Sequence, residues 1–348
     1  MYKGNLIAID LAKETFQVCL IDNQGKERIN RQMSRTKLIE WLARQAPSAV
    51  VFEACGSAHY WCRVVERMGH QGHQISALWV SRFRQGHKTD ATDARAIAIA
   101  YRQPKVKRVA AKSIEQQGLQ GIERIRQHFT DHLTATGNLI RGLLREFGLV
   151  VPKGKAALRA RIVEILQDEN TEMPQPLRKQ LMDLWGHYQH ADAQLRDSER
   201  LRDQLIVDHE ACRQLMRLEG VGPVNALNLY LCLGQQGKSF ANGREAATCI
   251  GLTPKQYSTG GKVVMLGISR VRTNRRLRST LVQGARSVMK ALRRRAPRSA
   301  REVWLKALIE RRGEGRAAVA YANKTVRLAW AMLHYGEEFR LETGLPST

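Results

Sequence analysis

The first hundred residues alternate between short apolar runs and segments with the hydrophobic spacing of a helix. The run LIAID is apolar up to a final carboxylate, which is typical of a buried strand. The next run, TFQVCLI, alternates apolar and polar positions, and the turn sequence DNQG leads from it to a third strand. The pattern therefore predicts an α/β domain whose first strands form a meander and whose later strands are linked through helices. We expect strands at 6–10, 15–21, 49–54 and 72–78, and helices at about 35–46 and 90–101.

The strand pattern disappears at about residue 112, and helical spacing continues to 147 and again from 155 to 210. Between 177 and 205 a seam of positions steps by four and three residues, a 3.5-residue period that fails near its end. Pro174 and Pro176 mark where this helix begins. The seam predicts a long helix that pairs with another helix, of the same chain or of a second protomer, or that packs on its own domain. Its positions are Leu177, Leu181, Leu184, Tyr188, Ala191, Leu195, Ser198, Arg202 and Leu205.

Basic residues are concentrated in the last third of the chain, where helical patterning returns at about 273–293 and 316–335. Lys and Arg number 57 against 32 acidic residues, a net charge of +25, and residues 255–312 contribute +15 of it with 17 basic and two acidic side chains. This balance predicts a polyanionic partner, most commonly nucleic acid, although a solvated basic surface gives the same count. We expect a cytoplasmic protein without a membrane partner, because the sequence has neither a membrane-spanning run nor a signal peptide.

Four acidic residues of the first domain are candidates for phosphoryl-transfer chemistry. Asp10 and Glu53 each end a predicted buried strand, where an unpaired charge is costly. Asp90 and Asp93 are three residues apart on one predicted helix, so they project from one face. Clustered carboxylates bind hard cations such as Mg²⁺, and a metal pair stabilises the attacking and leaving oxygens of a phosphodiester. The alternative for Asp90 and Asp93 is that they serve as helix caps alone.

Two glycine-containing turns of the C-terminal part are further candidates. In LEGVGPVNA (218–226), Gly220 and Gly222 would let the backbone of a helix-hairpin-helix element approach a phosphate. In the segment 250–287, the loop Ser-Thr-Gly-Gly places Ser258 in an open position ahead of a basic helix. A serine hydroxyl is a poor nucleophile unless a base or a metal activates it, so Ser258 could equally be an ordinary turn residue.

Several of these segments together resemble the DEDD transposases of bacterial insertion sequences. The first three are AIDLAKETF, FEACGSAHYW and GHKTDATDARAIA, around the four acidic residues, and the C-terminal three are GLTP, YSTGGK and LGIS with LRSTLVQGAR. The chain is most similar to the eleven-eleven subgroup of the one-hundred-and-ten family, with Piv-type DNA invertases as relatives. It departs from the family after GIS, where Arg270-Val271-Arg272-Thr273-Asn274 lacks the usual glycine.

The resemblance implies a fold and a mechanism. The fold class would be α/β plus α, with a RuvC-like, RNase H-type domain at 1–110, a helical or coiled-coil region at 111–210 and a mostly helical C-terminal transposase domain at 211–348. Asp10, Glu53, Asp90 and Asp93 would bind Mg²⁺. Ser258, with Thr259 as the rival, would attack DNA and form a covalent phosphoserine link.

The resemblance also implies the partners. They would be the DNA of the element ends and target, a non-coding bridge RNA that guides the enzyme by base pairing, and further copies of the chain in a dimer or tetramer, with the site completed between protomers. Two other functions stay open from the residues: a RuvC-like nuclease or junction resolvase that uses the carboxylates alone, and a non-catalytic nucleic-acid binder. Basic and turn residues expected at phosphates are Gly220, Gly222, Lys262, Arg270, Arg272, Arg275, Arg276 and Arg278.

Overall fold

The computed structural model describes residues 5–268 and 274–336, so Arg270 and Arg272 lie outside the described residues. The chain divides into two compact units. The first is formed mainly by residues up to Glu115 together with Cys232–Cys249, and the second mainly by Gln116–Leu231 and Ile250–Thr325. Within the described residues, no helix is both long enough and apolar enough to cross a bilayer.

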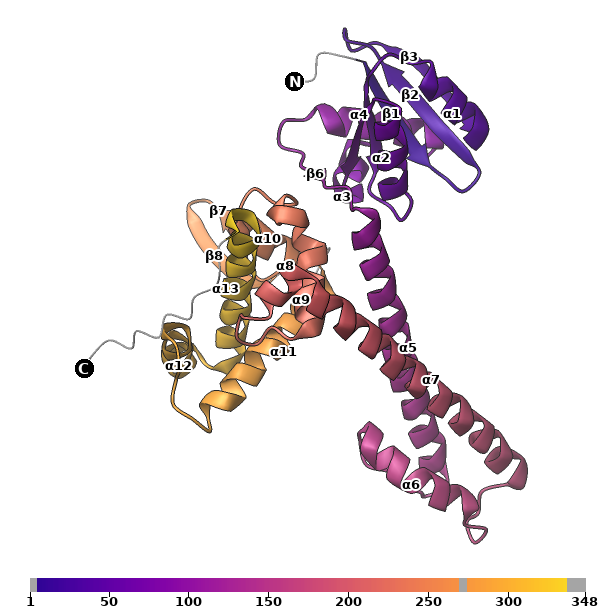
Figure 1. Ribbon diagram of the computed structural model, residues 1–348, viewed down its shortest axis with the longest axis vertical. Helices are drawn as coiled ribbons and strands as arrows, with labels where there is room; N and C mark the ends of the chain where they lie inside the picture. The colour runs from indigo at the N-terminus through magenta and orange to yellow at the C-terminus, as the bar shows by residue number, and fades with distance from the viewer. Residues whose placement is uncertain (1–4, 269–273, 337–348) are drawn as a thin grey trace, which may run out of the picture. The chain divides into compact units, whose positions relative to one another are not determined.

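A mixed sheet organises the first unit, and its strand order in the described residues is β3-β2-β1-β4-β5-β6 (Figure 1). The first three strands form the predicted antiparallel meander, β4 and β5 run parallel to β1, and the short β6 pairs antiparallel with β5. Helices α1 to α4 connect the later strands, as expected for an α/β domain. The strands are β1 (Leu6–Leu11), β2 (Thr15–Ile21), β3 (Glu27–Ser34), β4 (Ala49–Glu53), β5 (Gln71–Ile75) and β6 (Arg108–Val109).

Each face of this sheet has its own apolar core, because side chains alternate along a strand. Ile7 and Ile9 of β1 belong to the core on the face covered by α1 (Arg35–Ala43) and α2 (Ala58–Arg67). Leu6 and Ala8 belong to the core on the opposite face, covered by α3 (Ala77–Phe83) and α4 (Asp90–Arg102). The central strands are therefore buried on both sides, which explains why LIAID and AVVFE read as continuous apolar runs.

A side-chain cap fixes the start of helix α4, and a hydrogen bond links this helix to strand β3 of the meander. Thr89 is its N-cap, and Thr89 and Thr92 form a capping box in which each side chain accepts from the other's backbone N–H. Asn30 Nδ2 of β3 donates to Ala91 O at 3.2 Å. Because Thr89 caps the helix, Asp90 and Asp93 are not needed as N-caps, although both lie in its first turn.

Three helices of the second unit pack together: α5 (Ile114–Glu146), α6 (Lys155–Gln167) and α7 (Gln175–Asp208). Helix α7 begins directly after Pro174, as predicted. Its seam residues Leu181, Tyr188 and Leu195 lie in one buried core with residues of α5 and α6. The predicted partner of this seam is thus in the same chain.

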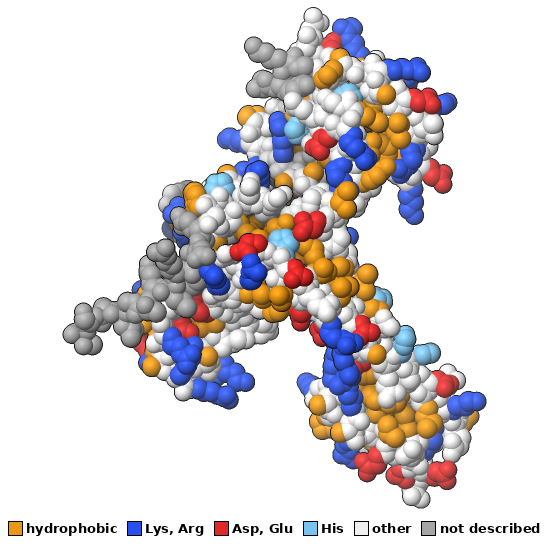
Figure 2. Space-filling model, in the orientation of Figure 1, with side chains coloured by type: hydrophobic (Ala, Val, Ile, Leu, Met, Phe, Trp, Pro, Cys, Tyr) orange, Lys and Arg blue, Asp and Glu red, His pale blue; other side chains and the backbone are white. Residues whose placement is uncertain are grey.

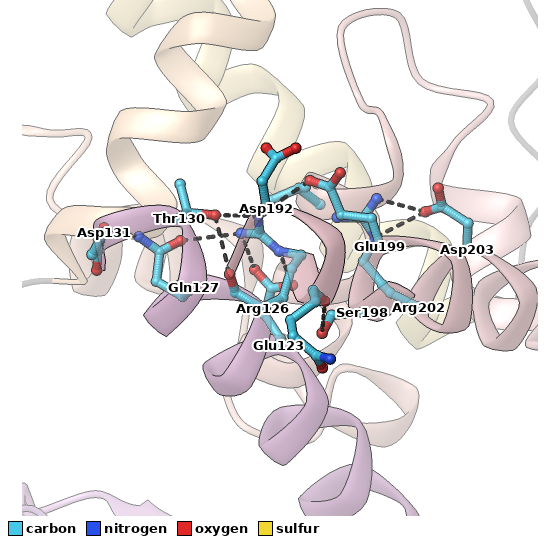
Figure 3. A network of polar contacts seen from close by, with 12 residues as sticks. Glu123, Arg126, Gln127, Thr130, Asp131, Asp192, Ser198, Glu199, Arg202 and Asp203 are labelled. Carbon is cyan, nitrogen blue, oxygen red and sulfur yellow. Dashed lines mark hydrogen bonds and ion pairs between the residues drawn. The ribbon is translucent and has the colours of Figure 1, made fainter. Parts of the chain in front are cut away.

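Charged side chains line the interface of α5 and α7 where the period of the α7 seam fails. Arg126 of α5 is buried and donates from Nε and Nη2 to both carboxylate oxygens of Glu123, each at 2.9 Å. Figure 3 shows this pair, with Arg126 Nη1 also 3.7 Å from Glu199 Oε1 of α7. Paired charges replace apolar contacts here, which accounts for Ser198 and Arg202 at seam positions that otherwise carry apolar side chains.

The remaining described residues are mostly helical. The predicted helices near 273–293 and 316–335 are present as α11 (Arg275–Leu292) and α13 (Glu314–Tyr335). A two-stranded hairpin, β7 (Pro254–Thr259) and β8 (Lys262–Ile268), follows α10 (Gly243–Ile250). The helices α8 (Glu210–Leu215) and α9 (Pro223–Leu233) lie on either side of Gly220 and Gly222, as a helix-hairpin-helix element requires, and α9 begins at Pro223. The pattern did not predict α3, β6 or α12 (Ala300–Arg312).

Candidate active site

Sheet register places Asp10 and Glu53 side by side. Strands β1 and β4 are parallel neighbours, and Ile9 is registered with Phe52, so Asp10 and Glu53 come next on the two strands. By strand alternation both carboxylates lie on the same side of the sheet as Ala8, which is the face covered by α4. Both side chains are half-buried.

The first turn of α4 brings the other two acids to this face. Asp93 is buried, 8% exposed, and forms an ion pair with Arg84. Asp90 is exposed and accepts a hydrogen bond from Gln32 Nε2 of β3 at 3.2 Å. We call the four acids, Asp10, Glu53, Asp90 and Asp93, the carboxylate edge.

The acids of the carboxylate edge interact electrostatically. Burial raises the pKa of Asp10 above its ordinary value, and the negative charges of Asp93 and Asp90 raise it further. Burial likewise raises the pKa of Glu53, with Asp10 and Asp93 as the next contributions. Arg84 opposes the shift at both groups. Neighbouring carboxylates that repel one another favour a cation between them, because a positive charge offsets that repulsion.

The carboxylate edge matches a hard divalent cation in donor chemistry, since carboxylate oxygens are the ligands that Mg²⁺ takes. Its side chains, however, are not closed around a common point. Within residues 5–268 and 274–336, no three His, Cys, Asp or Glu side chains are grouped closely enough to hold a metal ion. Asp93 is engaged by Arg84 instead. Binding of a metal ion would therefore require these side chains to turn toward one another.

Ser258 lies near the tip of the β7–β8 hairpin, which we call the serine hairpin. Gly260 and Gly261 form its turn, with φ of +53° and +80°. Two successive residues with positive φ give the turn that matches the twist of a hairpin, and glycine adopts this conformation without strain. Ser258 is registered with Val263 of β8, and its Oγ accepts a hydrogen bond from Gln256 Nε2 at 2.9 Å. An amide cannot take up the serine proton, so Gln256 is not a general base.

Ser258 and Thr259 lie on opposite faces of the serine hairpin, because they are adjacent on one strand. The hairpin is exposed along almost its whole length. Its apolar side chains are exposed too: Tyr257 is 63% exposed and Val263 64%. The hairpin therefore presents hydroxyl and apolar groups to solvent on a ribbon with little cover of its own.

Comparison with known proteins identifies the family. A family model described as a transposase, of the DEDD type, matches residues 7–148, and a model described as the transposase IS116/IS110/IS902 family matches residues 212–301. A probable family 20 transposase of Pseudomonas aeruginosa is 36% identical over 328 residues, covering 94% of this chain and 96% of its own. The chain belongs to the IS110 family of transposases.

Two further relatives carry the names of insertion sequences. The transposase for insertion sequence element IS1111A of Coxiella burnetii is 35% identical, covering 96% of this chain and 91% of its own. The transposase for insertion sequence element IS1328 of Yersinia enterocolitica is 33% identical, with coverage of 96% and 98%. The resemblance drawn from the sequence motifs is thus confirmed. Membership implies a DNA substrate and DNA-cleaving and rejoining activity.

The glycine turn of the transposase has a packing function that the motif alone did not indicate. Gly220 has φ +80°, and a Cβ on it would lie 2.7 Å from the carbonyl oxygen of Gly284 in α11. Gly220 thus lets the turn pack on α11. A Cβ on Gly222 would meet no atom within 4 Å, so Gly222 keeps the open surface expected for contact with a phosphate, directly before α9.

The predicted basic residues of the transposase differ in accessibility. Lys262 and Arg275 are exposed. Arg276 is half-buried with Nη2 3.8 Å from Glu123 Oε1, and Arg278 is buried, 8% exposed. Figure 2 shows Lys and Arg side chains spread over several parts of the visible face rather than in one stripe. Of these side chains, Lys262 and Arg275 are the best placed to reach a phosphate.

Sequence reasoning missed the residues that hold the acids of the transposase. Arg84 pairs with Asp93, and Gln32 of β3 donates a hydrogen bond to Asp90 of α4. The positive charge of Lys88 opposes the rise in the pKa of Glu53, which burial causes. Arg84 and Lys88 are close in the sequence to the DATDA motif, so proximity was an available signal for them. Gln32 is 58 residues from Asp90, and nothing in its local sequence singles it out.

Proposed function

We propose that this transposase excises and inserts an insertion sequence by Mg²⁺-dependent cleavage and rejoining of DNA through a covalent phosphoserine at Ser258. The arrangement of the carboxylate edge carries the proposal: register, alternation and the first turn of α4 place four acids on one face, with the pKa of Asp10 and Glu53 raised. The strand order with an antiparallel meander followed by parallel strands supports a RuvC-like, RNase H-type domain at 1–110.

In the proposed reaction the oxygen of Ser258 attacks the scissile phosphorus, the bond to one deoxyribose oxygen breaks, and that oxygen gains a proton. The serine proton must pass to another group, since Gln256 cannot take it. Rejoining reverses these events: a strand hydroxyl attacks the phosphoserine and releases Ser258, so the phosphodiester energy is conserved. Bound Mg²⁺ would supply charge stabilisation at the phosphate oxygens, held by Asp10, Glu53, Asp90 and Asp93.

The resemblance supports two further parts of the proposal. A non-coding RNA of the element would choose donor and target by base pairing, while the protein contacts backbone through Gly222, Lys262 and Arg275. The regions 111–210 and 211–348 would act as a helical region and a C-terminal transposase domain. Sequencing of RNA that copurifies with the protein tests the guide: a transcript complementary to element ends and target supports it, and its absence contradicts it.

Substitution at the hairpin separates the recombinase from a nuclease that uses the carboxylates alone. Ser258→Ala should abolish both strand exchange and the covalent protein–DNA adduct, a loss on the order of 10⁴-fold or more. Thr259→Ala, on the opposite face, is the matched control and should keep most activity. Undiminished cleavage by Ser258→Ala would support the nuclease, and loss in Thr259→Ala alone would move the nucleophile to Thr259.

A further inference from the structure

A cation of the chain itself already lies among the acids of the carboxylate edge. Arg84 forms an ion pair with Asp93, from Nε to Oδ1. Its positive charge also opposes the rise in the pKa of Asp10 and of Glu53, so the guanidinium acts on three of the four acids. Two cations at one carboxylate repel each other at close range. Arg84 therefore competes with a metal ion for this edge.

Asp93 needs a cation beside it in any arrangement of the edge. It is buried, and a buried carboxylate that loses its ion-pair partner is strongly destabilised. It is not required as a helix cap, because Thr89 caps α4. The edge accordingly has two stable arrangements: one with Arg84 at Asp93, which the structure shows, and one in which a metal ion takes the place of the guanidinium.

Arg84 is attached at a position from which its side chain can leave the edge. Helix α3 ends at Phe83, and Arg84 follows it with extended backbone, φ −69° and ψ 127°. The connection from there to α4, residues 85–89, is exposed. At Gly86, which has φ +77°, an added Cβ would meet no described atom within 4 Å. A movement of Arg84 therefore does not require either apolar core of the sheet to open.

A phosphodiester is a suitable acceptor for the guanidinium when it leaves Asp93. Arginine presents a planar fork of N–H donors that fits a carboxylate and a phosphate in the same geometry. In the proposed function a scissile phosphate comes to the carboxylate edge, where the negative charges of the acids repel it. An arginine that turns from Asp93 to this phosphate offsets the repulsion and frees the oxygens of Asp93 in one movement.

We propose that Arg84 is a phosphate-binding residue that neutralises Asp93 in the free protein, and that its transfer to DNA couples the binding of DNA to the binding of Mg²⁺. The inference rests on the proposed function, because it takes the carboxylate edge as the site of both ligands. Such coupling is reciprocal: DNA tightens metal binding by the same factor by which the metal tightens DNA binding. The free chain is thereby kept from loading metal before its substrate is bound.

Binding of Mn²⁺ to the DNA-free, full-length chain tests the competition, with the free ion counted by electron paramagnetic resonance. Mn²⁺ takes the same oxygen ligands as Mg²⁺. Arg84→Gln removes the competing charge and should bind Mn²⁺ about tenfold more tightly than wild type, within the usual range of coupling between sites. Arg84→Lys keeps a cation that can pair with Asp93 and should stay close to the wild-type affinity.

The matched control for this titration is Arg82→Gln. Arg82 is exposed, lies two residues from Arg84 and stacks over the ring of Trp79. Its removal lowers the charge of the chain by the same amount, yet it should leave the Mn²⁺ affinity unchanged. Equal or weaker binding of Mn²⁺ by Arg84→Gln, or equal tightening in both glutamine variants, would overturn the inference.

Thermal unfolding checks the fold and gives a second readout. In chelator, Arg84→Gln should melt below wild type, because the buried Asp93 has lost its partner. Saturating Mn²⁺ should then raise the Tm of the variant more than that of wild type, because the ion binds the variant more tightly and restores a positive charge. A lowered Tm that Mn²⁺ does not restore would mean that Arg84 is only a structural partner of Asp93.

The transfer to DNA is tested by the same titration on the protein with its copurified RNA and a duplex of the element end. Phosphate oxygens that bind the ion directly would tighten binding in any variant, so the gain in wild type is compared with the gain in Arg84→Gln. The wild-type gain should be larger by about tenfold. Equal gains would contradict transfer of Arg84 to the DNA.

Asp10→Asn separates this inference from the proposed function. If Asp10→Asn leaves Mn²⁺ binding unchanged, the carboxylate edge is not the metal site, and both the proposed function and the role of Arg84 are wrong. If Asp10→Asn abolishes Mn²⁺ binding while Arg84→Gln binds the ion as wild type does, the metal site stands and only the role of Arg84 is wrong.

Discussion

The strands that carry Asp10 and Glu53 are buried on both faces, whereas the hairpin that carries Ser258 is exposed along almost its whole length. The first region is fixed by two apolar cores and by ladders to neighbouring strands. The second is a two-stranded ribbon, an arrangement that is marginally stable by itself in water. The fold therefore fixes the backbone that carries the acids, while we expect the hydroxyl to be positioned when a partner covers the hairpin.

The largest effect is expected from a substitution in the carboxylate edge. Asp10→Asn removes a central carboxylate of the edge and should lower DNA cleavage at least about a hundredfold, by loss of charge at the site of transition-state stabilisation. DNA binding, measured by filter retention, should change little. Glu14→Gln is the control, because it removes an exposed charge close by in the chain. Equal loss in both variants, or normal cleavage in Asp10→Asn, would contradict a metal-binding role.

A moderate effect is expected from the turn of the serine hairpin. Gly261→Val forces a β-branched residue into φ +80°, at a cost of about 1–2 kcal/mol, which a marginal hairpin cannot absorb. Strand exchange should therefore fall roughly tenfold or more, since 1.4 kcal/mol corresponds to a factor of ten.

The matched control for the turn is Gly267→Val in β8, where a side chain has free space and no positive φ is required. That variant should retain activity. If both valine variants behave alike, the hairpin conformation is not what positions Ser258.

A smaller effect should come from the basic helix. Arg275→Ala removes one exposed guanidinium and should reduce the slope of log affinity against log salt by about 0.9, with a uniform loss across DNA sequences. Arg278→Lys keeps a positive charge at a buried position and should leave the slope unchanged. A titration of DNA affinity against salt distinguishes these outcomes, and an unchanged slope in Arg275→Ala would exclude a phosphate contact.

The smallest effect concerns stability and follows from the raised pKa of Asp10. The stabilising contribution of such a carboxyl is complete below its ordinary value of 3.8 and is lost as the pH rises through the higher pKa of the folded state. In chelator, Asp10→Asn should therefore raise Tm by a few degrees at pH 7, and this gain should vanish near pH 3. If the gain in Tm of Asp10→Asn instead increased as the pH falls, the result would contradict a raised pKa of Asp10.

The sequence predicted the first region well because its signals are local. Alternation, apolar runs and strand-end carboxylates identified β1, β2 and β4 and placed Asp10 and Glu53 at their ends. What it could not supply were contacts between distant segments. Gln32 at Asp90, and the approach of Gly220 to Gly284, depend on tertiary packing that no local pattern encodes.

The long helices also show what a local sequence pattern cannot predict, which is the partner of a helix. The α7 seam correctly predicted helix pairing but left its partner open, and the structure assigns α5 and α6. The period also failed at Ser198 and Arg202, where the buried Glu123–Arg126 pair of α5 faces α7 (Figure 3). The short elements α3 and β6 escaped detection because few residues carry their periodicity.

Mass spectrometry of the trapped protein–DNA adduct tests most directly whether the carboxylate edge and the serine hairpin act in one reaction. Wild-type protein incubated with element DNA, its copurified RNA and Mg²⁺ should yield a peptide with deoxyribose phosphate on Ser258, and both chelator and Asp10→Asn should abolish it. An adduct at another side chain, or one that forms equally without Mg²⁺ and in Asp10→Asn, would contradict the account.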